Sequence, residues 1–204
     1  MKLLLGTKNK NKIIEMSRIL KECLPDIELD IISLKDFDDV EEPIEDGTTF
    51  SENAVLKAKY YYDIFKIPTI ADDSGISVNA LDGRPGIYSA RYASTTNENS
   101  SSKANRDKLL EELKDKEDRS AYYTCAIALY YGDDYIVTED YTYGEILFEE
   151  VGSNGFGYDY IFHSTELNKP MGIATDDEKD SISHRAKAIR KLIKLIDEQK
   201  STKL

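Results

Sequence analysis

Hydrophobic and polar positions near the N-terminus follow first the pattern of a strand and then that of a helix. Residues 2–6 are a short apolar run, which predicts a buried strand. Apolar residues then recur at helical spacing and predict an amphipathic helix over residues 10–23. Those positions are Ile13, Met16, Leu20 and Cys23. Residues 28–33, ELDIIS, predict a second short strand, and this alternation favours an α/β fold.

A capping signal marks the start of a second helix. Thr49 is followed three residues later by Glu52, which forms a capping box and predicts a helix over residues 50–65. An apolar stripe supports this helix, with Phe50, Ala54, Ala58, Tyr61 and Phe65. Beyond it, residues 68–72 and 75–81 predict two strands that are interrupted at the pair Asp72-Asp73.

The second half of the chain has a different pattern. Three β-rich stretches follow a short leucine-rich helix near residue 110, and consecutive stretches of this kind favour antiparallel pairing. They are residues 121–131, 134–140 and 141–148, the first two separated by Gly132-Asp133. A C-terminal helix carries Ala186, Ile189, Ile193 and Ile196 on one face.

Loop 94–105, rich in Ser, Thr and Asn, predicts an exposed, mobile segment at the division between two lobes. We therefore expect one domain over residues 1–204, of α/β class, with a mixed twisted central sheet flanked by helices.

Composition narrows the class of protein. A chain of 204 residues is long enough to bury a sizeable core as one domain. Its formal net charge of −12 repels a polyanion, so extended binding to DNA or RNA is not expected. The apolar runs are too short for a membrane span or a signal peptide, and a cytoplasmic protein is the simplest interpretation. Cys23 and Cys125 lie outside any metal-ligand spacing and are expected to be small core residues.

The first polar cluster, GTKNKNK at residues 6–12, lies between the predicted strand and helix. A helix N-terminus offers N–H groups and a partial positive charge, and Thr7, Asn9 and three lysines add donors, so the segment suits a phosphate. It lacks the pattern of a Walker A loop. A solvated turn with surface lysines explains these residues equally well.

Carboxylates supply the next candidates. Glu45 precedes the second helix and either turns toward a metal or is solvated, while Asn53 and Lys57 share a polar helix face that meets solvent or lines a cleft. Asp72 and Asp73 are expected to point to opposite sides of the sheet if one strand runs through both. Their composition also suits a turn. At the carboxyl end of a strand, however, such residues border the usual ligand crevice of an open α/β sheet.

Two further segments suit a nucleotide. Residues 152–162, GSNGFGYDYIF, alternate glycines with aromatic residues, so the backbone can approach a flat ligand while Phe156 or Tyr158 stacks on it. Asp159 is a candidate acceptor for a base or ribose, although this alternation is also typical of a strand bend. His184 and Arg185 open the C-terminal helix, where cations oppose the helix dipole unless an anion lies beside them.

Taken together, these segments resemble the inosine triphosphate pyrophosphatase family, which acts on non-canonical purine nucleoside triphosphates. The matching motifs occur in family order over nearly the whole chain. They are Thr7–Lys12, Glu45–Ala54, Ile70–Gly75, Pro85–Tyr92, Gly155–Asp159 and Glu178–Arg185. The chain departs from the family pattern at Lys8, usually glycine, and at Tyr160, usually proline.

The resemblance implies an elongated two-lobed homodimer with the active-site cleft between its lobes. Its reaction would convert ITP, dITP or XTP to the monophosphate and pyrophosphate with Mg²⁺. Glu45 and Asp73 would bind the metal, and Asp73 would accept a proton from water with support from Asp72. Lys57, a further catalytic residue, would hold the triphosphate together with Thr7–Lys12. The residues expected to bind the nucleotide are Thr7, Lys8, Asn9, Lys10, Asn11, Lys12, Ser74, Phe156, Gly157, Tyr158, Asp159, Lys179, His184 and Arg185. Two alternatives are a pyrophosphatase for modified pyrimidine nucleotides and a nucleotide-binding sensor without catalysis.

Overall fold

The computed structural model describes residues 1–96 and 98–202, and the chain divides into two compact units. Unit 1 consists of Met1–Asp73, Cys125–Asp140 and the segment from Arg185 onward, and unit 2 consists of Ser74–Thr124 and Tyr141–His184. The chain crosses from one unit to the other within three long strands and at the start of the last helix.

Helices and strands alternate in the first third of the chain and are more segregated later. In chain order they are β1 (Lys2–Leu5), α1 (Lys10–Cys23), β2 (Asp30–Ser33), α2 (Phe50–Phe65), β3 (Thr69–Val78), α3 (Ser102–Glu112), β4 (Ser120–Tyr131), β5 (Asp134–Ile146), β6 (Phe162–Ser164), β7 (Lys169–Pro170), α4 (Asp176–Ile182) and α5 (His184–Thr202). None of these helices is long and apolar enough to span a membrane.

The strands form one open sheet of mixed direction. Its seven strands follow the order β2-β1-β3-β4-β5-β6-β7. β1 pairs in parallel with β2 and β3, as expected where helices connect the strands, and β6 pairs antiparallel with β5 and β7. The predicted class, a mixed sheet flanked by helices, is confirmed.

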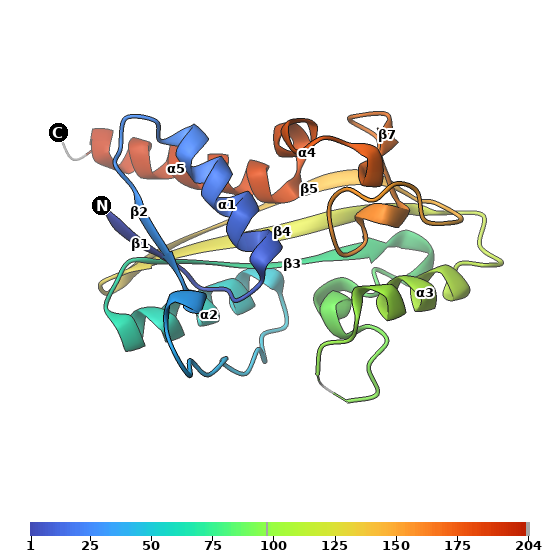
Figure 1. The fold of residues 1–204 in the computed structure, drawn as a ribbon, viewed down its shortest axis with the longest axis horizontal. Coiled ribbons are helices and arrows are strands. Elements are labelled where there is room, and N and C mark those ends of the chain that lie inside the picture. The colour runs from blue at the N-terminus through green and yellow to red at the C-terminus, as the bar shows by residue number, and fades with distance from the viewer. Residues whose placement is uncertain (97, 203–204) are drawn as a thin grey trace. The chain divides into compact units, whose positions relative to one another are not determined.

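In unit 1, helices cover the sheet on two sides (Figure 1). α1 and α5 pack on one side, where Leu3, Leu5 and Ile70 from the strands meet apolar residues of both helices. α2 packs on the other side, against Leu4 and Ala71. Strand alternation explains this division, because successive side chains of β1 and β3 point to opposite faces. Cys125 is fully buried in the core beneath α1, and Cys23 packs against the same core, as predicted.

Unit 2 has a core of its own. Leu109 of α3 and the C-cap residue Leu113 pack with Ile76 and Val78 of β3 and with Tyr123 of β4. The N-terminus of α3 is capped by Ser101, whose hydroxyl accepts the Ala104 N–H.

The ranges predicted for α1 and α2 agree with the structure, and the capping box of Thr49 and Glu52 is present. The interruption predicted at Asp72-Asp73 is wrong, because β3 is one continuous strand through both residues. Both carboxylates are buried and bind cationic side chains, so the backbone keeps its extended conformation and forms no turn. Long-range ion pairs outweigh the local turn preference of the sequence D-D-S-G.

Two other predictions are corrected. Residues 134–140 and the following stretch form one strand, β5, in which buried residues recur at alternate positions on both sides of the half-buried Asp140. The described residues of loop 94–105 lie within unit 2 and do not divide the units, while Asn97 lies outside the described residues. Asn105 is 3% exposed and its side chain bonds to the backbone of Ala90 and Ala93, which ties this segment to its own unit.

Candidate active site

The turn between β1 and α1 is organised by its own side chains. Asn9 is the N-cap, and its Oδ1 accepts the N–H groups of Asn11 and Lys12 at 3.0 and 3.2 Å. Thr7 Oγ1 in turn accepts the Asn9 N–H. Because the cap takes up two of the N–H groups predicted for a phosphate, neutralisation of an anion here depends on the lysine side chains. Lys8 Nζ donates to the Val40 carbonyl, and Lys10 is exposed.

Asp72 belongs to a buried network of four charged side chains in unit 1. Its Oδ2 lies 2.9 Å from Lys12 Nζ and 2.9 Å from Arg185 Nη2. Arg185 Nη1 reaches Glu15 Oε2 at 2.8 Å. Burial alone would raise the pKa of Asp72, but Lys12 and Arg185 outweigh it and hold this pKa well below its ordinary value. The network thus keeps Asp72 ionised and fixes α1 and α5 to β3.

Asp73 has a separate set of partners on α2. Its Oδ2 accepts a hydrogen bond from Asn53 Nδ2 at 3.1 Å, and its Oδ1 lies 3.6 Å from Lys57 Nζ. Asn53 also accepts the Gly47 N–H at 2.9 Å, and a Cβ on Gly47 would lie only 2.5 Å from Asn53 Oδ1. Burial raises the pKa of Asp73 against the opposing effect of Lys57. The carboxylate is therefore held in a defined orientation, with an increased affinity for a proton.

Lys57 joins Asp73 to Glu45. Its Nζ lies 3.2 Å from Glu45 Oε1, and the attraction of the two carboxylates overcomes burial and raises the pKa of Lys57. Two carboxylates within reach of one cation fit Mg²⁺, which takes one or two such ligands together with phosphate oxygens and water. Among the described residues no cluster of three or more metal-ligating side chains occurs, so the protein by itself offers Mg²⁺ a partial ligand set.

Unit 2 brings together the glycine-aromatic loop and α4. Asp159 is 3% exposed and accepts the Phe156 N–H at 2.9 Å and Lys179 Nζ at 2.8 Å. The Lys179 ammonium also lies 4.4 Å from the centre of the Phe156 ring. At Gly155, where φ is +80°, a Cβ would lie 2.3 Å from Asp159 Oδ2. The glycine is thus required for the close approach of Asp159 to this loop.

Aromatic side chains in this unit differ in their availability to a ligand. Phe156 is half-buried, whereas Tyr158 is 7% exposed and donates its hydroxyl hydrogen to the Ser89 carbonyl. The His184 ring stacks on Tyr123 with ring centres 4.6 Å apart. Phe156 is therefore better placed than Tyr158 to stack on a base.

Several of the predicted nucleotide contacts have partners within the protein, among them Arg185, Asp159 and Tyr158. An anion was expected beside His184 and Arg185. Asp72 and Glu15 supply this negative charge and bind the guanidinium of Arg185, a residue that is 1% exposed. Asp159 and Tyr158 are likewise buried, and their side chains form hydrogen bonds within the protein that shape the loop. In the structure these three side chains hold other residues of the protein in place.

Sequence reasoning missed Glu15 and Arg106, both buried and both bonded to remote partners. Glu15 lies three residues after Lys12 and four before Ile19, a spacing that signals the buried face of α1. Arg106 carries no comparable local signal.

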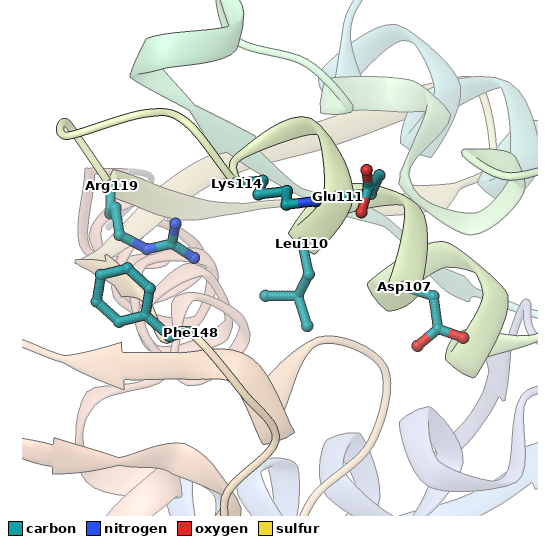
Figure 2. Close-up of a pocket in the computed structure, with 6 residues that line it drawn as sticks. All are labelled: Asp107, Leu110, Glu111, Lys114, Arg119 and Phe148. Carbon is teal, nitrogen blue, oxygen red and sulfur yellow. The ribbon is translucent and has the colours of Figure 1, made fainter.

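A pocket in unit 2 is distinct from these groups (Figure 2). Its lining residues are Asp107, Leu110, Glu111, Lys114, Arg119 and Phe148, none of which is a predicted site residue.

The model of the Ham1 family matches residues 3–195, a range that includes every candidate site residue. The chain belongs to the Ham1 family. It is 44% identical over 191 residues to the dITP/XTP pyrophosphatase of Desulfotalea psychrophila, covering 93% of this chain and 82% of that protein. It is 43% identical to the dITP/XTP pyrophosphatase of Vibrio cholerae, covering 98% of each chain.

Solved structures of Ham1 proteins agree with the fold. The Ham1 protein of Staphylococcus aureus superposes with a TM-score of 0.83 at 37% identity, covering 98% of this chain and all of that one. A HAM1 protein from Coxiella burnetii gives a TM-score of 0.83 at 35% identity, covering 97% and 99% of the two chains. The open mixed sheet is thus the fold of Ham1 proteins.

Proposed function

We propose that the chain hydrolyses non-canonical purine nucleoside triphosphates, namely ITP, dITP and XTP, to the monophosphate and pyrophosphate, and so removes them from the nucleotide pool. The observation that carries the proposal is the grouping of Glu45, Lys57 and Asp73 in a chain of the Ham1 family. Relatives 41–44% identical to it are named dITP/XTP pyrophosphatases.

Cleavage between the α and β phosphates requires a water aimed at phosphorus, a proton acceptor and neutralisation of the leaving pyrophosphate. Asp73 is the proposed acceptor, because Asn53 and Lys57 orient its two oxygens and burial raises its pKa. Lys57 and Lys12 supply positive charge that is already in place before the substrate binds. Asp72 keeps Lys12 and Arg185 in position and takes no proton itself.

We assign the triphosphate to Lys12, Lys57 and the segment Thr7–Asn11 of unit 1. Glu45 and Asp73 are the proposed ligands of Mg²⁺, which when bound would neutralise phosphate oxygens. This assignment is supported by the position of the two carboxylates, which lie close enough together to contact one cation, the Lys57 ammonium.

The base is assigned to the Phe156 ring as its stacking surface. Ser74 and Gly157, which belong to the matching motifs, are further proposed contacts. A purine with a carbonyl at the six position needs a hydrogen-bond donor there, and the same donor is left without a partner when adenine binds. The N–H of Phe156 already donates to Asp159, and the Arg185 guanidinium binds two carboxylates. We assign the reading of this carbonyl to His184, which belongs to the motif Glu178–Arg185 that resembles the family, with Lys179 beside Phe156.

Three further features belong to the proposal through the resemblance to the family. The chain would act as one catalytic domain, as a homodimer and in the cytoplasm. Its net charge of −12 favours a free nucleotide over nucleic acid or an anionic membrane as its partner.

A pyrophosphate-release assay tests the function directly. The panel comprises ITP, dITP, XTP, ATP, GTP, dUTP and 5-methyl-UTP, each with and without Mg²⁺. We expect Mg²⁺-dependent release with the first three nucleotides and little with ATP or GTP. Preference for dUTP or 5-methyl-UTP would identify a pyrimidine enzyme, and tight ITP binding without release would identify a sensor. Either result overturns the proposal.

A further inference from the structure

Arg106 is a buried arginine that no step of the proposed reaction uses. It lies on α3 at 5% exposure, and its Nε donates to Glu150 Oε1 at 2.8 Å. Its Nη1 donates to the Gly157 carbonyl at 2.7 Å. Its guanidinium carbon lies 4.7 Å from the centre of the Tyr160 ring. One side chain thus contacts the glycine-aromatic loop at two positions.

The loop requires such external contacts because its own backbone is permissive. Gly155 and Gly157, on either side of Phe156, have φ values of +80° and +63°. Glycine loses more conformational freedom on ordering than any other residue. Apart from its two neighbours in the chain, no described residue has an atom within 4 Å of the position that a Cβ on Gly157 would occupy, so side-chain packing does not restrict this residue.

Two side chains form hydrogen bonds with the backbone at Phe156 and at the residue that follows it. Asp159 accepts the N–H of Phe156 itself, and Arg106 binds the carbonyl of the following residue, Gly157. Because the donor is charged, the Arg106 bond is of the stronger class. Glu150 compensates the charge of Arg106, so the guanidinium stays in place without a bound nucleotide.

We propose that Arg106 is a positioning residue for nucleotide binding, which fixes the loop that carries Phe156 by clamping Gly157 and Tyr160. The inference rests on the assignment of Phe156 to the base in the proposed function. Arg106 touches no reacting atom, and its partners are separate from Glu45, Lys57 and Asp73. Its loss therefore weakens binding of the base and leaves the chemical step intact.

Arg106→Met tests this role, since methionine keeps much of the buried apolar stem and removes the three contacts. We expect the KM for ITP to rise about tenfold or more, the scale of one lost hydrogen bond to a charged group, while kcat changes less than about twofold. A fall in kcat with an unchanged KM overturns the proposal.

Arg119→Met is the matched control. Arg119 is also a buried arginine of unit 2, and it donates to the carbonyls of Leu113, Ile146 and Leu147. It too lies over an aromatic ring, with its guanidinium carbon 4.2 Å from the centre of the Phe148 ring (Figure 2). Its partners lie outside residues 155–160. Arg119→Met should lower the melting temperature as Arg106→Met does, without the increase in KM. An equal increase in both variants means that loss of stability is the cause, and the positioning role fails.

Tyr160 provides a second test of the clamp. Tyr160→Phe keeps a ring beneath the guanidinium and loses only the 3.3 Å hydrogen bond from its hydroxyl to the Gly155 carbonyl. It should therefore raise KM less than Tyr160→Leu, which removes the ring as well. Since Arg106 and Tyr160 act on the same loop, Arg106→Met combined with Tyr160→Leu should raise KM by less than the product of the two single effects. Independent, multiplicative effects contradict a shared clamp.

Hydrogen exchange separates the clamp from the proposed function. In the nucleotide-free protein, Arg106→Met should speed amide exchange within residues 155–160, and Arg119→Met should not. Unchanged exchange in Arg106→Met overturns the clamp even if the enzyme cleaves ITP. If the original protein releases no pyrophosphate, the proposed function fails, and the exchange result still decides whether Arg106 fixes this loop.

Discussion

Glu15→Gln perturbs the buried charge network while changing the shape of the side chain very little. Glu15, Asp72, Lys12 and Arg185 carry two negative and two positive charges, and Glu15 is 3% exposed. Glutamine removes one negative charge and leaves the network with an excess positive charge beside Asp72 and Arg185, which are 2% and 1% exposed. Because Arg185 keeps Asp72 as a partner, the network is weakened without being abolished.

The magnitude follows from burial. Removing one partner of a buried ion pair costs about 3–5 kcal/mol. Arg185 retains one carboxylate and the glutamine carbonyl still accepts a hydrogen bond, so we expect the lower end, about 3 kcal/mol. For a chain of this length, each kcal/mol shifts the melting temperature by about 2–4 °C, which gives a decrease of about 6–12 °C.

Glu22→Gln is the matched control, because Glu22 and Arg190 also join α1 to α5. Their ion pair, at 3.3 Å, is at the surface, with side chains 58% and 36% exposed. Exposed ion pairs contribute about 0–1 kcal/mol to stability. The free energy of unfolding should therefore decrease in Glu22→Gln by no more than about a third of its decrease in Glu15→Gln. Both free energies of unfolding are measured by urea denaturation at pH 7, with the melting temperature as a second readout. Equal losses in the two variants would refute the assignment of Glu15 to a buried, structurally important network.

Three further substitutions test the proposed chemistry. Asp73→Asn should abolish pyrophosphate release, because an amide accepts no proton at this pH, while calorimetry should still detect nucleotide binding; near-normal turnover would remove Asp73 from the catalytic role. Asn53→Ala should lower kcat about tenfold, since one hydrogen bond that orients a carboxylate is lost, and unchanged kcat in steady-state assays would contradict that orientation. His184→Ala should reduce the ratio of kcat/KM for ITP to that for ATP; an unchanged ratio excludes His184 as the reader of the base.

Local rules predicted those parts of the fold that depend on neighbours in the sequence. The Thr49 capping box and the apolar spacing of α2 act within a few residues, and the range of that helix was correct. The pairing of β4 with β5 through Gly132-Asp133 is equally local, with Gly132 at a φ of +67°. Where the nearest residues decide the conformation, the sequence is sufficient.

Predictions failed where distant partners decide. The strand was predicted to be interrupted at Asp72-Asp73, but Arg185, a partner of Asp72, lies 113 residues away, and Glu15 and Arg185 are 170 residues apart. The pattern of residues within one helix or strand does not predict a pairing between residues so far apart in the sequence. For the same reason, the sequence did not indicate that Arg185 binds Glu15 or that Asp159 binds Lys179.

The two adjacent aspartates illustrate how the same residue type acquires two properties. Strand alternation directs Asp72 to Lys12 and Arg185 of α1 and α5, and Asp73 to Asn53 and Lys57 of α2. Two close cations hold the pKa of Asp72 below its ordinary value, whereas burial raises that of Asp73 because its ionic contact is longer and Lys57 is shared with a second carboxylate. Asp72 is consequently a permanent anion that anchors the helices, and Asp73 is the member of the pair suited to accept a proton. The alternation of a single continuous strand, which a turn at this point would have destroyed, creates that difference.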